Sequence, residues 1–189
     1  MKAFGVALAF LFCAGWACAQ PDPAILEKLR SGGYVLYMRH ASTDFSQDDA
    51  MSRSYEDCAN QRNLTDKGRT EARSVGAHIK RLDIPIGEVL ASPFCRTMET
   101  ARLAFGKARP MTEVRGGPVR SENPARYEAL KTLLSTRIGK KENLAISGHG
   151  NPFHAVAGPP YLAEGEVAVV QPEGEGRFQV IARIRLEDW

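Results

Sequence analysis

Two histidines in this chain each follow a short apolar run that carries no charge. His40 comes after Tyr34–Met38 and is preceded directly by Arg39. His149 comes after residues 143–147 and lies between two glycines, which let the backbone approach a ligand closely. A neutral imidazole is a good nucleophile near neutral pH, and the planar fork of an arginine can bind two oxygens of a phosphate group. This combination predicts an enzyme that transfers phosphoryl groups through His40.

The runs before the two histidines are typical of strands buried on both faces, as in a parallel sheet. Residues at the carboxyl ends of such strands lie where open α/β sheets bind their ligands. Further strands are predicted at 88–91 and 110–114, a closing hairpin at 166–171 and 177–186, helices at 23–30 and 65–82, and two more helices that open at Ser92 and Asn123. Because strands and helices alternate, we expect a three-layer α/β/α domain with a mostly parallel central sheet, to which the C-terminal β-hairpin adds an antiparallel edge.

A second arginine is placed by the helix that is expected after the strand at residues 88–91. Serine caps helices and proline favours their first position, so Ser92-Pro93 predicts a helix start. Arg96 then falls in the first turn, where the backbone N–H groups already favour an anion. We expect Arg96 to add its charge to the phosphate site.

The polar stretch Ser42–Asn63 is long for a loop in a compact domain, and such loops often bind substrates or act as lids. It follows His40 directly, so we expect it to lie beside the phosphate. Its mixed acids and bases suit hydroxyl-rich or charged leaving groups. Arg62, near its end, is the substrate contact that we expect from it. A mobile surface excursion stays open as the alternative.

Residues 1–19 resemble an export signal, with a basic residue near the start, a short apolar core and small residues before the expected cleavage point. We expect this signal peptide to be removed and residues 20–189 to form a single domain in the periplasm or outside the cell. No stable membrane insertion is expected after cleavage, because the apolar core is short for a membrane span. Lipidation of Cys18 stays open as an alternative.

Charge and cysteine content limit the partners. The net charge is +3 with both signs interspersed, and no basic stripe with aromatic residues appears, so a nucleic-acid partner is not expected.

Outside the signal, Cys58 and Cys95 are expected to form a disulfide in an oxidising compartment; two separate buried thiols are the alternative. No metal-ligand spacing occurs, so neither a metal nor a cofactor is expected. The oligomeric state stays open.

Four stretches, in order, resemble motifs of the histidine phosphatase superfamily, the group with the phosphoglycerate-mutase-like fold. They are Met38–Ala41, similar to its Arg-His-Gly signature; Leu64–Ala72, similar to its Leu-Thr-x-x-Gly-x-x-Gln-Ala helix start; Ser92–Ala101, which matches Ser-Pro-x-x-Arg-x-x-x-Thr-Ala; and Ile146–Asn151, similar to the segment with its second histidine. Together they span most of the chain beyond the signal.

The resemblance implies roles for individual residues. His40 would be the nucleophile and become a phosphohistidine, while Arg39, Arg96 and His149 would surround the phosphoryl group without a metal. Further substrate contacts are expected, in addition to Arg62, from Thr43, Ser46 and Asn151, and Ser46 stands where many members have a phosphate-binding asparagine. For the proton donor we expect Glu113, which lies in the corresponding part of the chain; Asp44 and Glu122 stay open as alternatives.

The function expected from this resemblance is an exported phosphatase that hydrolyses phosphomonoesters. Its substrate would be a small molecule or a glycan. Small exported relatives remove phosphate from the sugar core of lipopolysaccharide, which suggests phosphorylated sugars of the cell envelope. Small cytoplasmic relatives dephosphorylate protein phosphohistidine, and this activity stays open. So does a non-catalytic module that binds phosphate without turnover.

Overall fold

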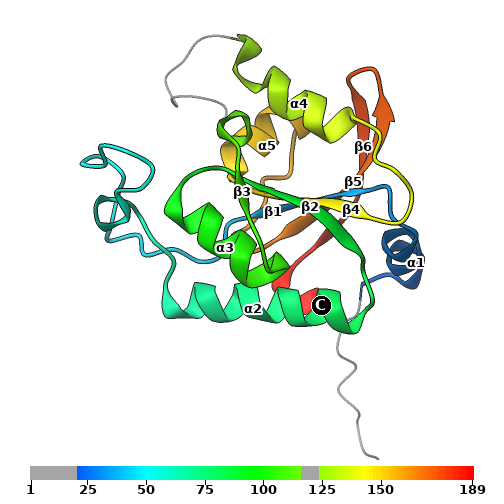
Figure 1. Cartoon of the computed structure of the whole chain (residues 1–189), viewed down its shortest axis with the longest axis horizontal. Coiled ribbons are helices and arrows are strands. Elements are labelled where there is room, and N and C mark those ends of the chain that lie inside the picture. The colour runs from blue at the N-terminus through cyan, green and yellow to red at the C-terminus, as the bar shows by residue number, and fades with distance from the viewer. Residues whose placement is uncertain (1–20, 116–123) are drawn as a thin grey trace, which may run out of the picture.

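The computed structural model describes residues 21–115 and 124–189, and this part of the chain is organised around a six-stranded sheet of order β3-β2-β4-β1-β5-β6 (Figure 1). The strands are β1 (Val35–Arg39), β2 (Ile86–Ala91), β3 (Arg109–Pro110), β4 (Asn143–Gly148), β5 (Val167–Gly174) and β6 (Arg177–Ile184). β1, β2, β3 and β4 run parallel, whereas β5 is antiparallel to β1 and β6 is antiparallel to β5. The expected α/β sheet with an added antiparallel hairpin is confirmed.

Helices cover both faces of the sheet. They are α1 (Pro23–Ser31), α2 (Asp66–Arg81), α3 (Cys95–Phe105), α4 (Glu128–Ser135) and α5 (Gly150–Ala157). In Figure 1, α2 and α3 lie on one side of the strands and α4 and α5 on the other. The three-layer arrangement leaves the carboxyl ends of β1 and β4 as the edge at which loops can build a site.

Strand β1 shows why the centre of the sheet is apolar on both faces. Leu36 and Met38 pack in the cluster that contains residues of α1 and α2, whereas Val35 and Tyr37 pack in the cluster that contains residues of α4 and α5. All four are fully buried. A strand covered twice needs apolar residues at every position, because successive side chains point to opposite faces.

Two helix starts and one turn follow from local chemistry. Thr65 caps α2 as expected, since its hydroxyl accepts a hydrogen bond from the Gly68 N–H at 3.0 Å. Asp22 caps α1 in the same way, through the Ala24 N–H at 2.8 Å. Between β5 and β6, Glu175 and Gly176 have φ of 52° and 73°, the positive values that two-residue hairpin turns use.

Two sequence expectations near the site are wrong. The helix expected to open at Ser92 starts at Cys95 instead, with Phe94 at the N-cap and no side-chain cap. The strand expected at 110–114 ends at Pro110, and Thr112–Val114 form a 3-10 helix with Val114 buried. In the first place the Ser92 hydroxyl bonds to another segment instead of capping the helix, and in the second the 3-10 helix buries Val114.

Some expectations lie outside the described residues. These are the signal peptide with Cys18, the helix start at Asn123 and the candidate proton donor Glu122. Within the described part, Pro124–Tyr127 form a 3-10 helix that leads into α4. Among the described residues, no helix is both long enough and apolar enough to span a membrane.

Candidate active site

The pairing of β1 with β4 brings His40 and His149 together. The strands are parallel, and Arg39 at the end of β1 lies opposite Gly148 at the end of β4. The next residue on each strand is a histidine, and the two ring centroids are 5.5 Å apart. The His40 N–H also donates to the Gly148 carbonyl at 3.0 Å. Two segments far apart in sequence therefore meet because their strands are neighbours.

His40 is held in the form that a nucleophile needs. Its Nδ1 lies 3.0 Å from the carbonyl oxygen of Ala41, and only a protonated Nδ1 can bond to a carbonyl, so Nε2 carries the lone pair. The side chain is 2% exposed. Burial, and then the charges of Arg96 and Arg39, lower the pKa of His40 to about 3. The imidazole is therefore neutral and nucleophilic from mildly acidic pH upward.

His149 is fixed by two neighbouring hydroxyls. Its Nε2 lies 2.8 Å from the Ser92 Oγ. The Tyr37 hydroxyl donates to the His149 carbonyl at 2.8 Å and accepts from its N–H at 3.0 Å. Burial, then the neighbouring His40 and Arg96, hold the pKa of His149 well below its usual value. Sequence reasoning gave Ser92 the role of a helix cap, and the structure places it against the second histidine instead.

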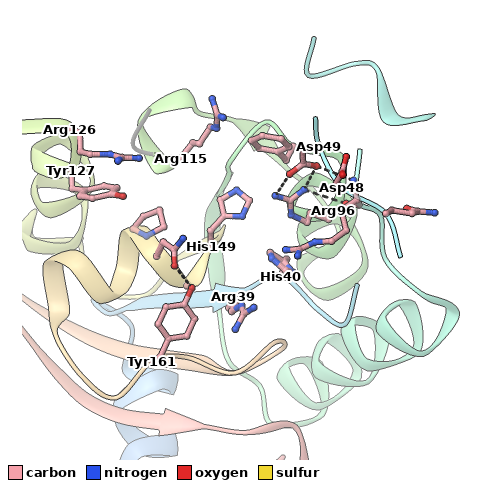
Figure 2. A pocket seen from close by; sticks show the side chains of 16 residues that line it. Arg39, His40, Asp48, Asp49, Arg96, Arg115, Arg126, Tyr127, His149 and Tyr161 are labelled. Carbon is pink, nitrogen blue, oxygen red and sulfur yellow. Dashed lines mark hydrogen bonds and ion pairs between the residues drawn. The ribbon is translucent and has the colours of Figure 1, made fainter. Parts of the chain in front are cut away.

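Both histidines open into a pocket of about 300 Å³ (Figure 2). Its lining contains five arginines, which are Arg39, Arg62, Arg96, Arg115 and Arg126. The first three each have a buried Nε–H without a hydrogen-bond partner in the described part of the chain. A buried donor without a partner costs about 1–3 kcal/mol, so these guanidinium groups suit an anion that would satisfy them.

A loop carboxylate occupies the fork of Arg96. The two Oδ atoms of Asp49 lie 2.9 and 3.1 Å from the two Nη atoms of Arg96, as the dashed lines in Figure 2 show. Asp49 also accepts from the Arg62 N–H at 2.9 Å. Burial raises the pKa of Asp49, but the bonds from Arg96 and Arg62 outweigh burial and hold it below its usual value. The arginine expected to bind phosphate is thus already bound to a carboxylate of the loop.

Covalent and polar links hold this loop against α3. Cys58 forms a disulfide with Cys95, the first residue of α3. Beside it, the Gln61 amide oxygen accepts from the Cys95 N–H at 2.9 Å, and its NH₂ group donates to the Tyr55 carbonyl at 3.1 Å. The loop 42–63 therefore lies beside the pocket with its base anchored at the helix that carries Arg96.

We expect Asp49→Asn to tighten the binding of inorganic phosphate. Phosphate must displace Asp49 to reach the fork of Arg96, and a hydrogen-bonded charge pair contributes about 1.5–3 kcal/mol. Its loss should lower the inhibition constant of phosphate by on the order of 10-fold. Asp44→Asn is the control: Asp44 belongs to the same loop but does not line the pocket, and its Oδ1 accepts from the Ser46 N–H. An equal gain in both variants, or no gain at Asp49, would contradict the displacement.

The structure brings some of the other expected contacts to the pocket and not others. Arg62 and Asn151 line it, and Asn151 accepts a hydrogen bond from the Tyr161 hydroxyl at 2.5 Å. Thr43 is buried outside the lining, and Ser46 is exposed and bonded to the Asp44 carboxylate at 2.7 Å.

The expected proton donor lies outside the pocket. Glu113 is an exposed residue of the 3-10 helix and is not among the lining residues. Asp44, one of its alternatives, is not among them either. In the part of the chain that the structure describes, the pocket carboxyls are Asp48 and Asp49. The strand expected at 110–114 stops early, and the tighter 3-10 turn that replaces it buries Val114 and exposes Glu113.

Sequence reasoning missed Glu164. Its carboxylate accepts from the Thr43 hydroxyl at 2.7 Å and from the Thr43 N–H at 3.2 Å. The same carboxylate is 3.6 Å from Arg39 and 3.7 Å from Nδ1 of His40. It balances charge beside the nucleophile. No local motif could have revealed it, because the contact depends on the turn that precedes β5.

The described residues contain no group of three or more His, Cys, Asp or Glu side chains that could hold a metal ion. The described lining of the pocket offers two neutral imidazoles, guanidinium groups and carboxylates. Such a set can bind a phosphoryl group and transfer it to a nitrogen nucleophile.

Comparisons with known proteins find a family model and solved structures to which the chain is similar. The family model of the histidine phosphatase superfamily (branch 1) matches residues 35–116. No curated protein matches the chain in sequence. The protein histidine phosphatase SixA complexed with tungstate is a similar solved structure, with 24% identity, a TM-score of 0.54, and coverage of 81% of this chain and 97% of that one.

Two further structures show the same fold. YhfR of Bacillus stearothermophilus has 18% identity and a TM-score of 0.57, over 79% of this chain and 95% of its own. A phosphoserine phosphatase mutant of Entamoeba histolytica, in complex with phosphoserine, has 11% identity and a TM-score of 0.53, over the same shares of the two chains. The chain therefore resembles the histidine phosphatase superfamily over residues 35–116, and it shares the phosphoglycerate-mutase-like fold of these structures.

Proposed function

We propose that the protein is an exported phosphatase that hydrolyses phosphomonoesters through a phosphohistidine on His40. The observation that carries this proposal is the state of His40: a buried, neutral imidazole whose Nδ1 is bound to the Ala41 carbonyl, so that Nε2 has the lone pair. The guanidinium groups of Arg39 and Arg96 line the same pocket.

The reaction takes two transfers. In the first, Nε2 of His40 forms a bond to phosphorus and the bond from phosphorus to the ester oxygen breaks. In the second, water gives a proton to the carboxylate that was the donor in the first transfer and attacks phosphorus, and the N–P bond breaks, which yields inorganic phosphate and restores the neutral imidazole. The charge on the three equatorial oxygens is stabilised by the arginines and by His149 in both steps.

The leaving alcohol needs a proton in the first transfer. Asp49 is paired with Arg96 and its pKa is lowered, so in this arrangement it is a poor donor. Asp48 is the other described carboxyl in the pocket lining, and we assign the proton transfer to it in place of Glu113.

The proposed substrate and cellular location rest on the signal-like N-terminus and not on the pocket. The signal-like residues 1–19 support export to the periplasm or beyond, and phosphorylated sugars of the cell envelope are then the substrates within reach. The positively charged donors of the pocket support a mechanism that needs no metal.

A second candidate activity is the dephosphorylation of protein phosphohistidine. The observation that favours it is the similarity to SixA, whose structure is that of a protein histidine phosphatase. Comparing turnover of a phosphohistidine peptide with turnover of sugar phosphates would separate the two substrates.

Trapping the intermediate tests the mechanism. We expect the mature protein, incubated with radiolabelled acetyl phosphate in excess chelator and quenched, to carry a label that is stable in alkali and lost in acid, as a phosphohistidine is. The label should map to the peptide that contains His40 and should be absent from His40→Asn.

Three results would contradict the proposal. Tight phosphate binding without a label or turnover would indicate a non-catalytic module. An acid-stable label would indicate another nucleophile. Activity that chelation abolishes and a divalent ion restores would indicate a metal-dependent reaction.

A further inference from the structure

The carboxylate of Glu164 contacts three groups at the end of β1. Its Oε1 accepts from the Thr43 hydroxyl at 2.7 Å, and its Oε2 accepts from the Thr43 N–H at 3.2 Å. Oε1 also lies 3.6 Å from Nη2 of Arg39 and 3.7 Å from Nδ1 of His40. The side chain is only 14% exposed and is not part of the pocket lining. Glu164 is therefore close to the nucleophile on its Nδ1 side without lining the pocket in which the ester would bind.

The segment that carries Glu164 is fixed to the end of β1 by backbone hydrogen bonds. The Gly165 N–H donates to the carbonyls of Arg39 and His40, at 3.2 and 3.0 Å. Nη1 of Arg39 donates in turn to the Leu162 carbonyl at 2.8 Å. The position of the Glu164 carboxylate relative to the imidazole of His40 is thus set by several bonds on both sides of it in the chain.

The proposed reaction creates a positive charge on His40. When Nε2 forms its bond to phosphorus, Nδ1 keeps the proton that it donates to the Ala41 carbonyl, so the ring becomes an imidazolium. In the second transfer the electron pair of the N–P bond returns to Nε2, and the ring leaves as a neutral imidazole. If Nδ1 lost its proton first, the leaving group would be an imidazolate anion, which leaves poorly because it is strongly basic.

Most charges that face His40 oppose an imidazolium. Besides burial, three cations from separate elements lower the pKa of His40, and they are Arg96 of α3, Arg39 of β1 and Arg62 of the loop 42–63. His149, at the end of β4, is neutral. Asp48 and Asp49 belong to the loop 42–63, and Asp49 is paired with an arginine. In the described part of the chain, Glu164 is the acid within ion-pair distance of the His40 ring.

We propose that Glu164 keeps the phosphohistidine protonated at Nδ1, so that water can break the N–P bond. Glu164 is then a positioning residue, because it acts through His40 and does not touch the ester. An opposite charge within about 4–6 Å shifts a pKa by about 1–3 units towards the charged form, so Glu164 extends hydrolysis of the phosphoenzyme to higher pH. This inference rests on the proposed function, because it requires a phosphohistidine on His40.

The decay of the phosphoenzyme as a function of pH tests this role. The mature protein is labelled briefly with radiolabelled acetyl phosphate and diluted into excess unlabelled acetyl phosphate at each pH, and the label that remains is measured in quenched samples. The decay should slow above an alkaline limit, at which Nδ1 loses its proton. The cations that face His40 cannot cause this limit, because arginines stay protonated. In Glu164→Gln the limit should lie lower by about one pH unit or more.

Glutamine removes the charge of Glu164 and little else. Its oxygen can accept from the Thr43 N–H while its NH₂ group donates to the Thr43 hydroxyl, so both contacts can be kept. Glu164→Asp retains the carboxylate and should bring the limit back towards its original pH. The matched control is Glu166→Gln. Glu166 is a buried acid of the same segment whose carboxylate accepts from the Ala163 N–H at 2.7 Å, and its variant should keep the original limit.

The outcomes separate this inference from the proposed function. An unchanged alkaline limit in folded Glu164→Gln, or an equal shift in Glu166→Gln, would overturn the role of Glu164. If Glu164→Gln does not fold, Thr43→Val decides, because it removes the hydroxyl that holds Oε1 and should move the limit in the same direction by less. An unchanged limit there would count against Glu164 in the same way. Absence of any label on His40 in the unchanged protein would instead contradict the proposed function.

Discussion

His40→Asn should reduce the hydrolysis of p-nitrophenyl phosphate by on the order of 10⁴-fold or more, because the variant lacks the atom that attacks phosphorus. Asparagine is close to histidine in size and can donate to the Ala41 carbonyl in place of Nδ1. The buried site should therefore keep its packing while it loses its nucleophile. The measurement is kcat with saturating substrate, together with the thermal unfolding midpoint of each variant.

His78→Asn is the matched control for the loss of a histidine. His78 lies on α2, where its ring is edge-on to Trp189, and it does not line the pocket. Its variant should keep kcat within about twofold, as expected for a substitution away from the reacting atoms. A folded His40→Asn protein with more than a few per cent of the original turnover would remove His40 from the role of nucleophile.

The second large effect is expected from Arg96→Lys. Arg96 binds the Asp49 carboxylate with both Nη atoms, which shows that its fork accepts two oxygens at once. Lysine keeps the charge but supplies a point donor without the fork. By analogy with the loss of one oxyanion-hole donor, kcat/KM should fall by about 100-fold or more.

The control for Arg96→Lys is the same change on the same helix. Arg102 is exposed and lies in the last turn of α3, so Arg102→Lys should leave kcat/KM unchanged. Arg96 is only 5% exposed, and its variant also loses the pairing with Asp49. Unfolding midpoints therefore accompany the kinetics. A folded Arg96→Lys enzyme within threefold of the original would exclude Arg96 from the phosphoryl site.

Local sequence predicted the elements that place His40, His149 and Arg96. Apolar runs without charge identified β1 and β4, because a strand covered by helices on both faces needs apolar residues at every position. Arg96 lies in the first turn of α3 even though the helix starts later than expected. Motif order then pointed to the superfamily that the family match supports.

Predictions of single contacts were wrong where the contact depended on the path of a loop. Glu113 was chosen for its position in the chain, and a 3-10 helix exposes it instead. Ser92 was interpreted as a helix cap, but its hydroxyl lies against His149. A capping signal reports only on neighbours within a few residues, so it could not reveal a partner on another strand.

The sequence by itself determined the alternation of strands and helices, the two histidines at strand ends, and Arg39 and Arg96 as the arginines expected beside the phosphate. These features depend on patterns among residues that are close together in the chain. Only the tertiary structure decided that Asp49 fills the fork of Arg96, that Glu164 lies behind His40, and that Arg115 faces the pocket across Phe94. Each of these contacts joins segments whose separation is set by strand order and loop path. Neither quantity is encoded in the spacing of neighbouring residues.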